Sequence, residues 1–191
     1  MSTPFVTELE ELGYFNGLEP ESAEALKEDF EQNGWVGIFS ESHRFFMADA
    51  EDLAEGGVGH FLQAVSPFLA LQGITLPEIE EISEEGYVVR VGGADYQIYD
   101  AEDLERDASG EESGLIWGLS MVHGFRIVDD LLAAAGSAER AYAVNGGNDL
   151  FVLFLTPELH RVIMEHPDAS RGDGPYVPQE EYPSFGQPEE E

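Results

Sequence analysis

The sequence predicts an α+β protein in which antiparallel hairpins alternate with helices that pack on the sheet. The first observation is a set of short apolar segments joined by glycine-containing turns. Residues 87–91 and 96–99 flank Gly92-Gly93, and residues 141–144 and 151–155 flank Asn145-Gly146-Gly147. Such pairs of segments are typical of β-hairpins, because these turn residues tolerate the backbone angles that a tight hairpin needs.

The second observation is that apolar residues at helical spacing follow these segments. One stripe runs from Val58 to Val65 and is followed by Pro67 and Gly73, and a longer one runs from Ile116 to Leu131 and is followed by Gly136. Spacings of three and four residues place the apolar side chains on one helix face, which has to be buried. We therefore expect these helices, and a short third one over residues 160–165, to cover one face of an antiparallel sheet.

The third observation is an internal echo. The pentapeptide Asp-Ala-Glu-Asp-Leu occurs at residues 49–53 and again at 100–104, and a polar turn flanked by residues 36–39 and 45–47 precedes the first copy as a further predicted hairpin. The context therefore indicates a possible duplication. The predicted core, residues 35–167, then consists of hairpin–helix units at 36–86, 87–140 and 141–167, with an extra strand near residues 78–82.

The two ends of the chain have different patterns. Residues 1–34 predict two helices packed on the core, because Thr3-Pro4 is a helix-start pattern and Asn33-Gly34 is a helix-end pattern. Residues 168–191 are rich in Pro, Gly and Glu, so we expect a mostly unstructured acidic tail. Within it, Tyr176, Tyr182 and Phe185 offer aromatic side chains that can dock on the core.

Charge is the most informative feature for function. The chain has 191 residues with 8 Lys and Arg against 40 Asp and Glu, a formal net charge of −32. A surface this negative repels both nucleic-acid phosphates and anionic lipid, which argues against direct binding to either. The most apolar stretch, residues 115–128, contains His123 and Arg126 and is too short to cross a bilayer. No basic leader segment opens the sequence, so we expect a cytoplasmic protein.

No pattern for catalysis, metal or cofactor binding emerges. Cysteine is absent, and the five histidines do not form a zinc motif. An EF-hand reading that starts at Asp103 fails because Ala108 and Gly114 stand where glycine and glutamate are required. Ser120, His123 and Asp129 are close in sequence, but the motif that exposes a catalytic serine is missing. We therefore predict no catalytic residue, no metal site and no cofactor.

The acidity itself predicts a non-enzymatic protein that covers the basic surface of another protein. Carboxylates can replace phosphates as partners of Arg and Lys, so the expected partner is a nuclease toxin or a DNA-binding protein, and the chain would act as an immunity protein or a DNA mimic. The predicted contact residues lie in the second pentapeptide and in the acidic loop expected there, which is longer and more acidic than its counterpart after Leu53: Asp100, Glu102, Asp103, Glu105, Asp107, Glu111 and Glu112.

Two other readings stay open at this point. The acidity is also typical of a salt-adapted cytosolic protein, in which carboxylates only hold water and ions. An enzyme or a small-ligand binder with a site that no motif reveals is the third reading; a pocket with several buried carboxylates of raised pKa would favour it.

Overall fold

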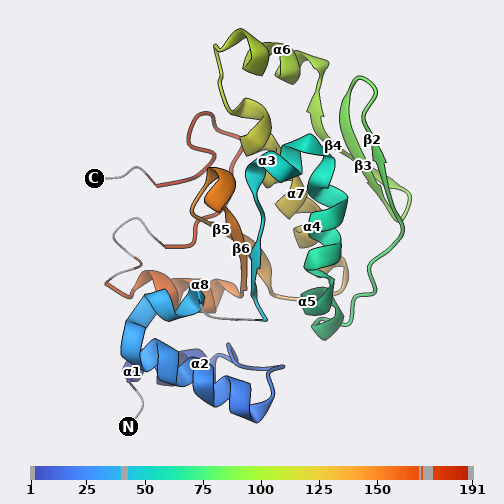
Figure 1. Ribbon diagram of the computed structural model, residues 1–191. Helices are drawn as coiled ribbons and strands as arrows, with labels where there is room; N and C mark the ends of the chain where they lie inside the picture. Colours follow the sequence, from blue (N-terminus) through green and yellow to red (C-terminus); the bar gives the residue numbers. More distant parts are fainter. Residues whose placement is uncertain (1–2, 40–42, 168, 170–173, 189–191) are drawn as a thin grey trace.

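The computed structural model describes residues 3–39, 43–167, 169 and 174–188, and it confirms the α+β class (Figure 1). Its two three-stranded antiparallel sheets have the strand orders β1-β6-β5 and β2-β3-β4. The strands are β1 (Phe45–Met47), β2 (Ile79–Ile82), β3 (Gly86–Val91), β4 (Ala94–Asp100), β5 (Arg140–Val144) and β6 (Phe151–Leu155). The α-helices are α1 (Pro4–Glu11), α2 (Pro20–Asn33), α3 (Ala50–Asp52), α4 (Val58–Ala64), α5 (Ser66–Leu71), α6 (Ala101–Ser109), α7 (Leu115–Ala134) and α8 (Pro157–Met164). Shorter helical segments are η1 (Gly34–Phe39), η2 (Leu53–Gly57) and η3 (Gly147–Asp149).

The sheet β1-β6-β5 separates two apolar clusters. Alternate residues of a strand point to opposite faces, and here both faces are buried. Ala143 and Phe154 belong to a cluster with α4, α5 and α7, and the rings of Phe68 and Phe154 stack at a centroid distance of 4.1 Å. Val144 and Leu155 belong to the other cluster, which contains side chains of α1, α2 and α8. This sheet is therefore an internal layer between helices.

The sheet β2-β3-β4 has one buried and one open face. Tyr87, Val89, Val91 and Ile98 are buried in the same cluster as α4 and α7, whereas residues such as Arg90 and Gln97 point away from it. Helix α7 contacts both β4 and β5, so it lies between the two sheets (Figure 1). The expected hairpin at Gly92-Gly93 is confirmed, and both glycines have the positive φ angles, 58° and 88°, that a tight hairpin turn requires.

The two predicted N-terminal helices are confirmed. The Thr3 hydroxyl accepts a hydrogen bond from the Val6 amide at 3.4 Å and so caps α1, and Gly34 ends α2 with a φ of 59°. Their buried face contains Leu9, Leu26 and Phe30, which pack in the cluster on the outer face of the sheet β1-β6-β5. The apolar residues at helical spacing in residues 3–33 are therefore the buried faces of α1 and α2.

The first predicted hairpin is wrong. Residues 34–39 form the 3₁₀ segment η1, and β1 pairs with β6 instead of with an upstream strand. The backbone of η1 lies against α2, because a Cβ on Gly37 would lie 3.0 Å from the backbone of Phe30. Strand β1 instead uses an edge that the hairpin β5-β6 leaves open, where the rings of Phe45 and Phe151 stack at 4.6 Å.

The repeated pentapeptides nevertheless have the same local role. Asp49 follows β1 and caps α3 by accepting the Glu51 amide hydrogen at 2.9 Å, and Asp100 ends β4 and caps α6 by accepting that of Asp103 at 2.9 Å. Thr156 does the same after β6. The echo therefore reflects a strand, a cap and a helix; the division of the chain into duplicated units stays a prediction.

The described part of the C-terminal segment is packed on the core, which corrects the expectation of a mostly unstructured tail. Tyr176 exchanges two backbone hydrogen bonds of 2.9 Å with Ala143, and its hydroxyl donates to the Asn145 carbonyl at 2.8 Å. Phe185 is buried directly over Gly118, where a Cβ would lie 2.1 Å from the ring. Tyr182 is half-buried against the same cluster, so docking of all three aromatic residues is confirmed. Residues 168, 170–173 and 189–191 of the predicted tail lie outside the described residues.

Candidate functional site

The predicted contact residues lie at the end of β4 (Asp100), in helix α6 and in the loop after it. A capping box begins the helix: Asp100 accepts from the Asp103 amide, and the Asp103 carboxylate accepts from the Asp100 amide, both at 2.9 Å. Carboxylates in the first turn of a helix also interact favourably with its dipole. Two of the predicted contact residues therefore have a structural role in starting α6.

Arg106 neutralises part of this acidic segment. Its guanidinium lies 2.5 Å from Asp103 and 3.1 Å from Glu112, and the hydrogen bond to Asp103 is the main reason why the pKa of Arg106 is raised. The cross-link from α6 to Glu112 holds the helix against the following loop. Asp103 and Glu112 are therefore partly neutralised within the chain.

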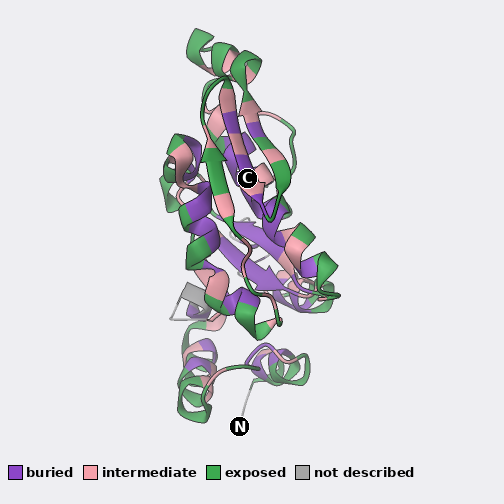
Figure 2. Ribbon diagram, turned by 90° about the vertical axis from the view of Figure 1, so that its right-hand side faces the viewer, coloured by how far each residue is buried: buried purple, intermediate pink, exposed green. Residues whose placement is uncertain are grey.

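The remaining predicted residues differ in exposure. Glu102, Glu105 and Glu111 are exposed and belong to none of the ion pairs found in the described part of the chain, while Asp107 is half-buried. Helix α6 buries none of its side chains, and its one large apolar residue, Leu104, is 37% exposed. Figures 1 and 2 show α6 at the end of the molecule opposite to α1 and α2. The structure thus presents a protruding acidic helix.

An open groove of about 410 Å³ lies beside this helix, between β4 and α7. Its lining includes the carboxylates of Asp95, Asp103 and Asp130 and the side chain of Arg126. Tyr96 and Tyr99 also line it, and burial, helped by Asp130 in the case of Tyr96, raises the pKa of both phenols. Carboxylates and aromatic rings in one groove can together hold a cationic side chain.

The three residues of the hypothetical Ser-His-Asp arrangement do not meet. Ser120 is fully buried, and His123 interacts through Nδ1 with the Ile98 carbonyl at 2.6 Å and through Nε2 with Glu180 at 3.2 Å. Asp129 accepts the Ala141 amide hydrogen at 2.8 Å, and burial raises its pKa to about 6. Within the described residues, no group of three His, Asp or Glu side chains is placed to hold a metal ion, and no helix is long and apolar enough to cross a membrane.

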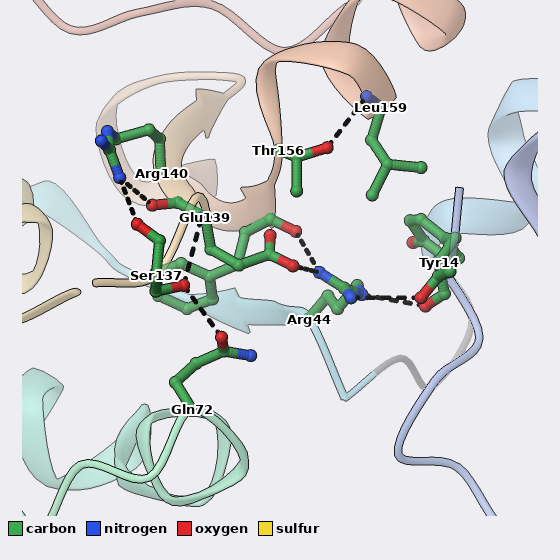
Figure 3. Close-up of polar contacts among 10 residues, drawn as sticks. Tyr14, Arg44, Gln72, Ser137, Glu139, Arg140, Thr156 and Leu159 are labelled. Carbon is green, nitrogen blue, oxygen red and sulfur yellow. Dashed lines mark hydrogen bonds and ion pairs between the residues drawn. The ribbon is translucent and has the colours of Figure 1, made fainter. Parts of the chain in front are cut away.

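A buried ion pair, which sequence reasoning missed, joins the segment before β1 to the loop between α7 and β5 (Figure 3). Arg44 donates to the Glu139 carboxylate at 2.7 Å, and the two side chains are only 5% and 9% exposed. Arg44 also donates to the carbonyls of Tyr14 at 2.9 Å and Phe154 at 3.2 Å. It therefore links the loop after α1, strand β6 and the loop between α7 and β5.

Glu139 belongs to a longer polar network at the same place. Its amide donates to the Ser137 hydroxyl at 3.2 Å, and this hydroxyl donates to the Gln72 side chain at 2.9 Å (Figure 3). A cavity of about 300 Å³ lies next to the pair. The one sequence signal for this site was a lone arginine directly before an apolar strand, in a chain with few basic residues.

Comparisons with known proteins add no functional assignment: no known family model, no curated protein and no solved structure matches the chain.

Proposed function

We propose that the chain is a binding protein whose acidic α6 end covers a basic surface of another protein. The proposal rests on the observation that α6 buries no side chain. Its Glu102 and Glu105, and Glu111 in the next loop, are exposed carboxylates that form no ion pair in the described part of the chain. Apart from the favourable interaction of Glu102 with the dipole of α6, these charges repel one another. A cationic partner gives them a favourable interaction.

Such a surface affects both how fast a basic partner approaches and which contacts it makes after binding. A net charge of −32 accelerates the approach of a basic protein, since opposite long-range fields steer diffusion. At contact, exposed carboxylates accept charge-assisted hydrogen bonds from Arg and Lys. The neighbouring groove, with Asp130 and the ring of Tyr96, offers a place for one inserted cationic side chain, whereas its Asp95 is already paired with Arg90 at 2.6 Å.

The partner class follows from the chemistry of these groups. A protein surface that binds nucleic acid is rich in Arg and Lys arranged to contact phosphates, and carboxylates present a similar charge to the same groups. The proposed partner is therefore a nuclease toxin or a DNA-binding protein, which the chain would block. DNA and this chain should then compete for one surface.

The test starts with capture of partners from the host lysate at low salt and their release by high salt. The recovered protein is then purified, and its binding to a DNA duplex is measured with increasing amounts of this chain. The expected result is a basic protein whose DNA binding is lost as the 1:1 complex forms. Absence of a basic partner, or a partner that binds DNA equally well in the complex, would overturn the proposal.

A further inference from the structure

We infer that the open groove between β4 and α7 binds a free α-amino acid through both its ammonium and its carboxylate group. The ammonium group would lie at Asp130 and the carboxylate at Arg126, next to the ring of Tyr96. The groove has a volume of about 410 Å³, which is sufficient for a molecule of this size. The inference does not depend on the proposed function, but a cationic side chain of a protein partner would use the same Asp130 and would compete with the amino acid.

Arg126 differs from the other cationic side chains of this acidic chain. Each of the other lysines and arginines that the structure describes donates to a carboxylate or to a backbone carbonyl: Lys27, Arg44, Arg90, Arg106, Arg140 and Arg161. Arg126 is exposed and makes no hydrogen bond or ion pair with a described residue, although the chain has 40 Asp and Glu. A guanidinium is a strong donor to carboxylates, so a free one in a groove indicates a place for an anionic group.

The other charged groups of the groove, apart from Asp130, already have partners within the chain. Asp95 and Asp103 are held by arginines at 2.6 Å and 2.5 Å, and the two ring nitrogens of His123 have acceptors at 2.6 Å and 3.2 Å. In the described part of the groove, the charges left for a ligand are therefore one positive charge, on Arg126, and one negative charge, on Asp130. Both side chains are exposed and can reach a bound molecule.

These two charges lie on the same face of α7, because the residues are four positions apart. Residues at this spacing commonly form an ion pair, but Arg126 and Asp130 form none. Both act on the phenol of Tyr96: burial and then the charge of Asp130 raise its pKa, and the charge of Arg126 opposes this. Opposite charges therefore lie near one phenol without pairing. This arrangement matches an α-amino acid, which carries an ammonium and a carboxylate group on one carbon atom.

The charge of the whole chain also favours a ligand without net charge. A net charge of −32 repels an anion at long range. A simple cation is attracted by this field but is repelled by Arg126 inside the groove. An amino acid has no net charge and gives each of the two side chains an opposite partner. The rings of Tyr96 and Tyr99 add an aromatic surface on which the side chain of the amino acid can pack.

Three compounds with the same phenyl body test the inference: L-phenylalanine carries both charged groups, phenethylamine only the ammonium, and hydrocinnamate only the carboxylate. Each is titrated into the labelled full chain near neutral pH at physiological salt, and the NMR signals of the Tyr96 ring and the Arg126 side chain are followed. We expect phenylalanine to shift both signals in a saturable way and to bind at least about tenfold more tightly than phenethylamine, with hydrocinnamate the weakest.

Two results would overturn the inference. One is the absence of saturable shifts at Tyr96 and Arg126 with phenylalanine. The other is binding of phenethylamine that is as tight as that of phenylalanine or tighter, because the groove would then respond only to positive charge. The second result would leave the proposed function standing, since a groove that prefers a cation still suits a basic protein partner.

Two variants assign the two ends of the ligand. Arg126→Gln removes the partner of the carboxylate, so it should weaken phenylalanine binding at least about tenfold without weakening phenethylamine binding. Asp130→Asn removes the partner of the ammonium and should weaken the binding of both compounds. Arg161→Gln is the matched control, because Arg161 is an exposed arginine on α8 that does not line the groove.

All three variants change exposed side chains and should fold, which thermal unfolding checks. An equal loss of phenylalanine and phenethylamine binding in Arg126→Gln would contradict the assignment of the carboxylate to Arg126. A loss of phenylalanine binding in Arg161→Gln as large as that in Arg126→Gln would place the ligand outside the groove.

Discussion

The two ends of the molecule are both acidic, but their helices are held in different ways. Residues 3–33, with α1 and α2, contain nine acidic residues and one lysine, and residues 100–112, with α6, contain seven acidic residues and one arginine. Beneath the first set, Leu26 and Phe30 are buried, and the ring of Phe30 contacts that of Tyr14 at 5.6 Å. Beneath the second set nothing from α6 itself is buried.

The acidic residues therefore have different structural roles on the two helices. On α2 the carboxylates are the solvent face of a helix whose other face stabilises the fold, which is the ordinary arrangement of an amphipathic helix. On α6 the helix is held by its capping box and by Arg106, and hydrophobic burial contributes little. Acidity alone therefore does not identify a site; acidity on an element that the core does not need is the stronger signal.

The largest expected effect is on global stability. Phe30→Ala should lower the free energy of unfolding by about 3–5 kcal/mol, because it leaves a cavity among Phe5, Tyr14 and Phe15. Leu104→Ala on α6 should cost less than about 1 kcal/mol, since the side chain is already partly in water. Denaturant unfolding of both variants measures this. Equal losses of unfolding free energy would contradict the claim that burial stabilises α2 but not α6.

Salt should stabilise the chain through both ends. The screening length falls from about 30 Å at 0.01 M to about 3 Å at 1 M salt, so repulsion among the excess carboxylates weakens. We expect the unfolding midpoint to rise between low salt and roughly 0.5 M NaCl and then to level off as screening becomes complete. Thermal unfolding across salt checks this. A midpoint that keeps rising steeply into molar salt would instead favour the salt-adapted alternative.

Asp129 is a half-buried carboxylate between the two ends, and its protonation differs from that expected of a fully exposed one. Burial raises the pKa of Asp129 to about 6, so the folded state binds this proton more tightly than the unfolded chain does. Its contribution to stability is therefore greatest below a pH of about 4 and is lost as the pH rises through about 6. Asp129→Asn keeps an acceptor for the Ala141 amide and removes the half-buried charge.

The expected result for Asp129→Asn is a gain on the order of 1 kcal/mol at neutral pH that vanishes near pH 4. Denaturant unfolding of both proteins over this pH range measures it. Glu28→Gln, an exposed change in the middle of α2, serves as the control for replacing a carboxyl group by an amide. A pH-independent difference for Asp129→Asn would contradict the account.

The smallest expected effect is local. Arg106→Gln should release α6 from Glu112 and increase hydrogen exchange of the α6 amides severalfold, with little change in global unfolding. Lys27→Gln removes the contacts of Lys27 to Glu10 and Glu24 but should leave exchange in α2 nearly unchanged, because Leu26 and Phe30 still anchor that helix. A larger increase in amide hydrogen exchange in α2 of Lys27→Gln than in α6 of Arg106→Gln would contradict this expectation.

The sequence allowed the local elements to be predicted because their signals are local. Thr3-Pro4 and Gly92-Gly93 specify a cap and a turn by their own chemistry, and each is found in that role. Helix α6 was not predicted, because an acidic loop was expected after the second pentapeptide. The pairing of β1 with β6 was not predictable in this way. It joins residues about a hundred positions apart and depends on which strand edge stays open after the hairpin β5-β6 has formed.

The candidate sites show the same limit. The acidic residues after β4 were visible in the sequence, but the pairing of Asp103 and Glu112 with Arg106 required the turn between α6 and α7. The Arg44–Glu139 pair and its cavity were invisible, because their residues come from four separated segments. The docking of Phe185 was hidden by a Pro- and Gly-rich composition, which excludes regular elements but not tight packing over Gly118.

The most direct test of the central claim compares two variants with equal loss of charge. One carries Glu102→Gln, Glu105→Gln and Glu111→Gln at the α6 end, and the other carries Glu21→Gln, Glu28→Gln and Glu31→Gln on α2; all six residues are exposed. Affinity for the purified basic partner is measured at physiological salt. The account predicts a loss of at least about tenfold for the α6 variant and less than about threefold for the α2 variant. Equal losses, or a larger loss for the α2 variant, would contradict it.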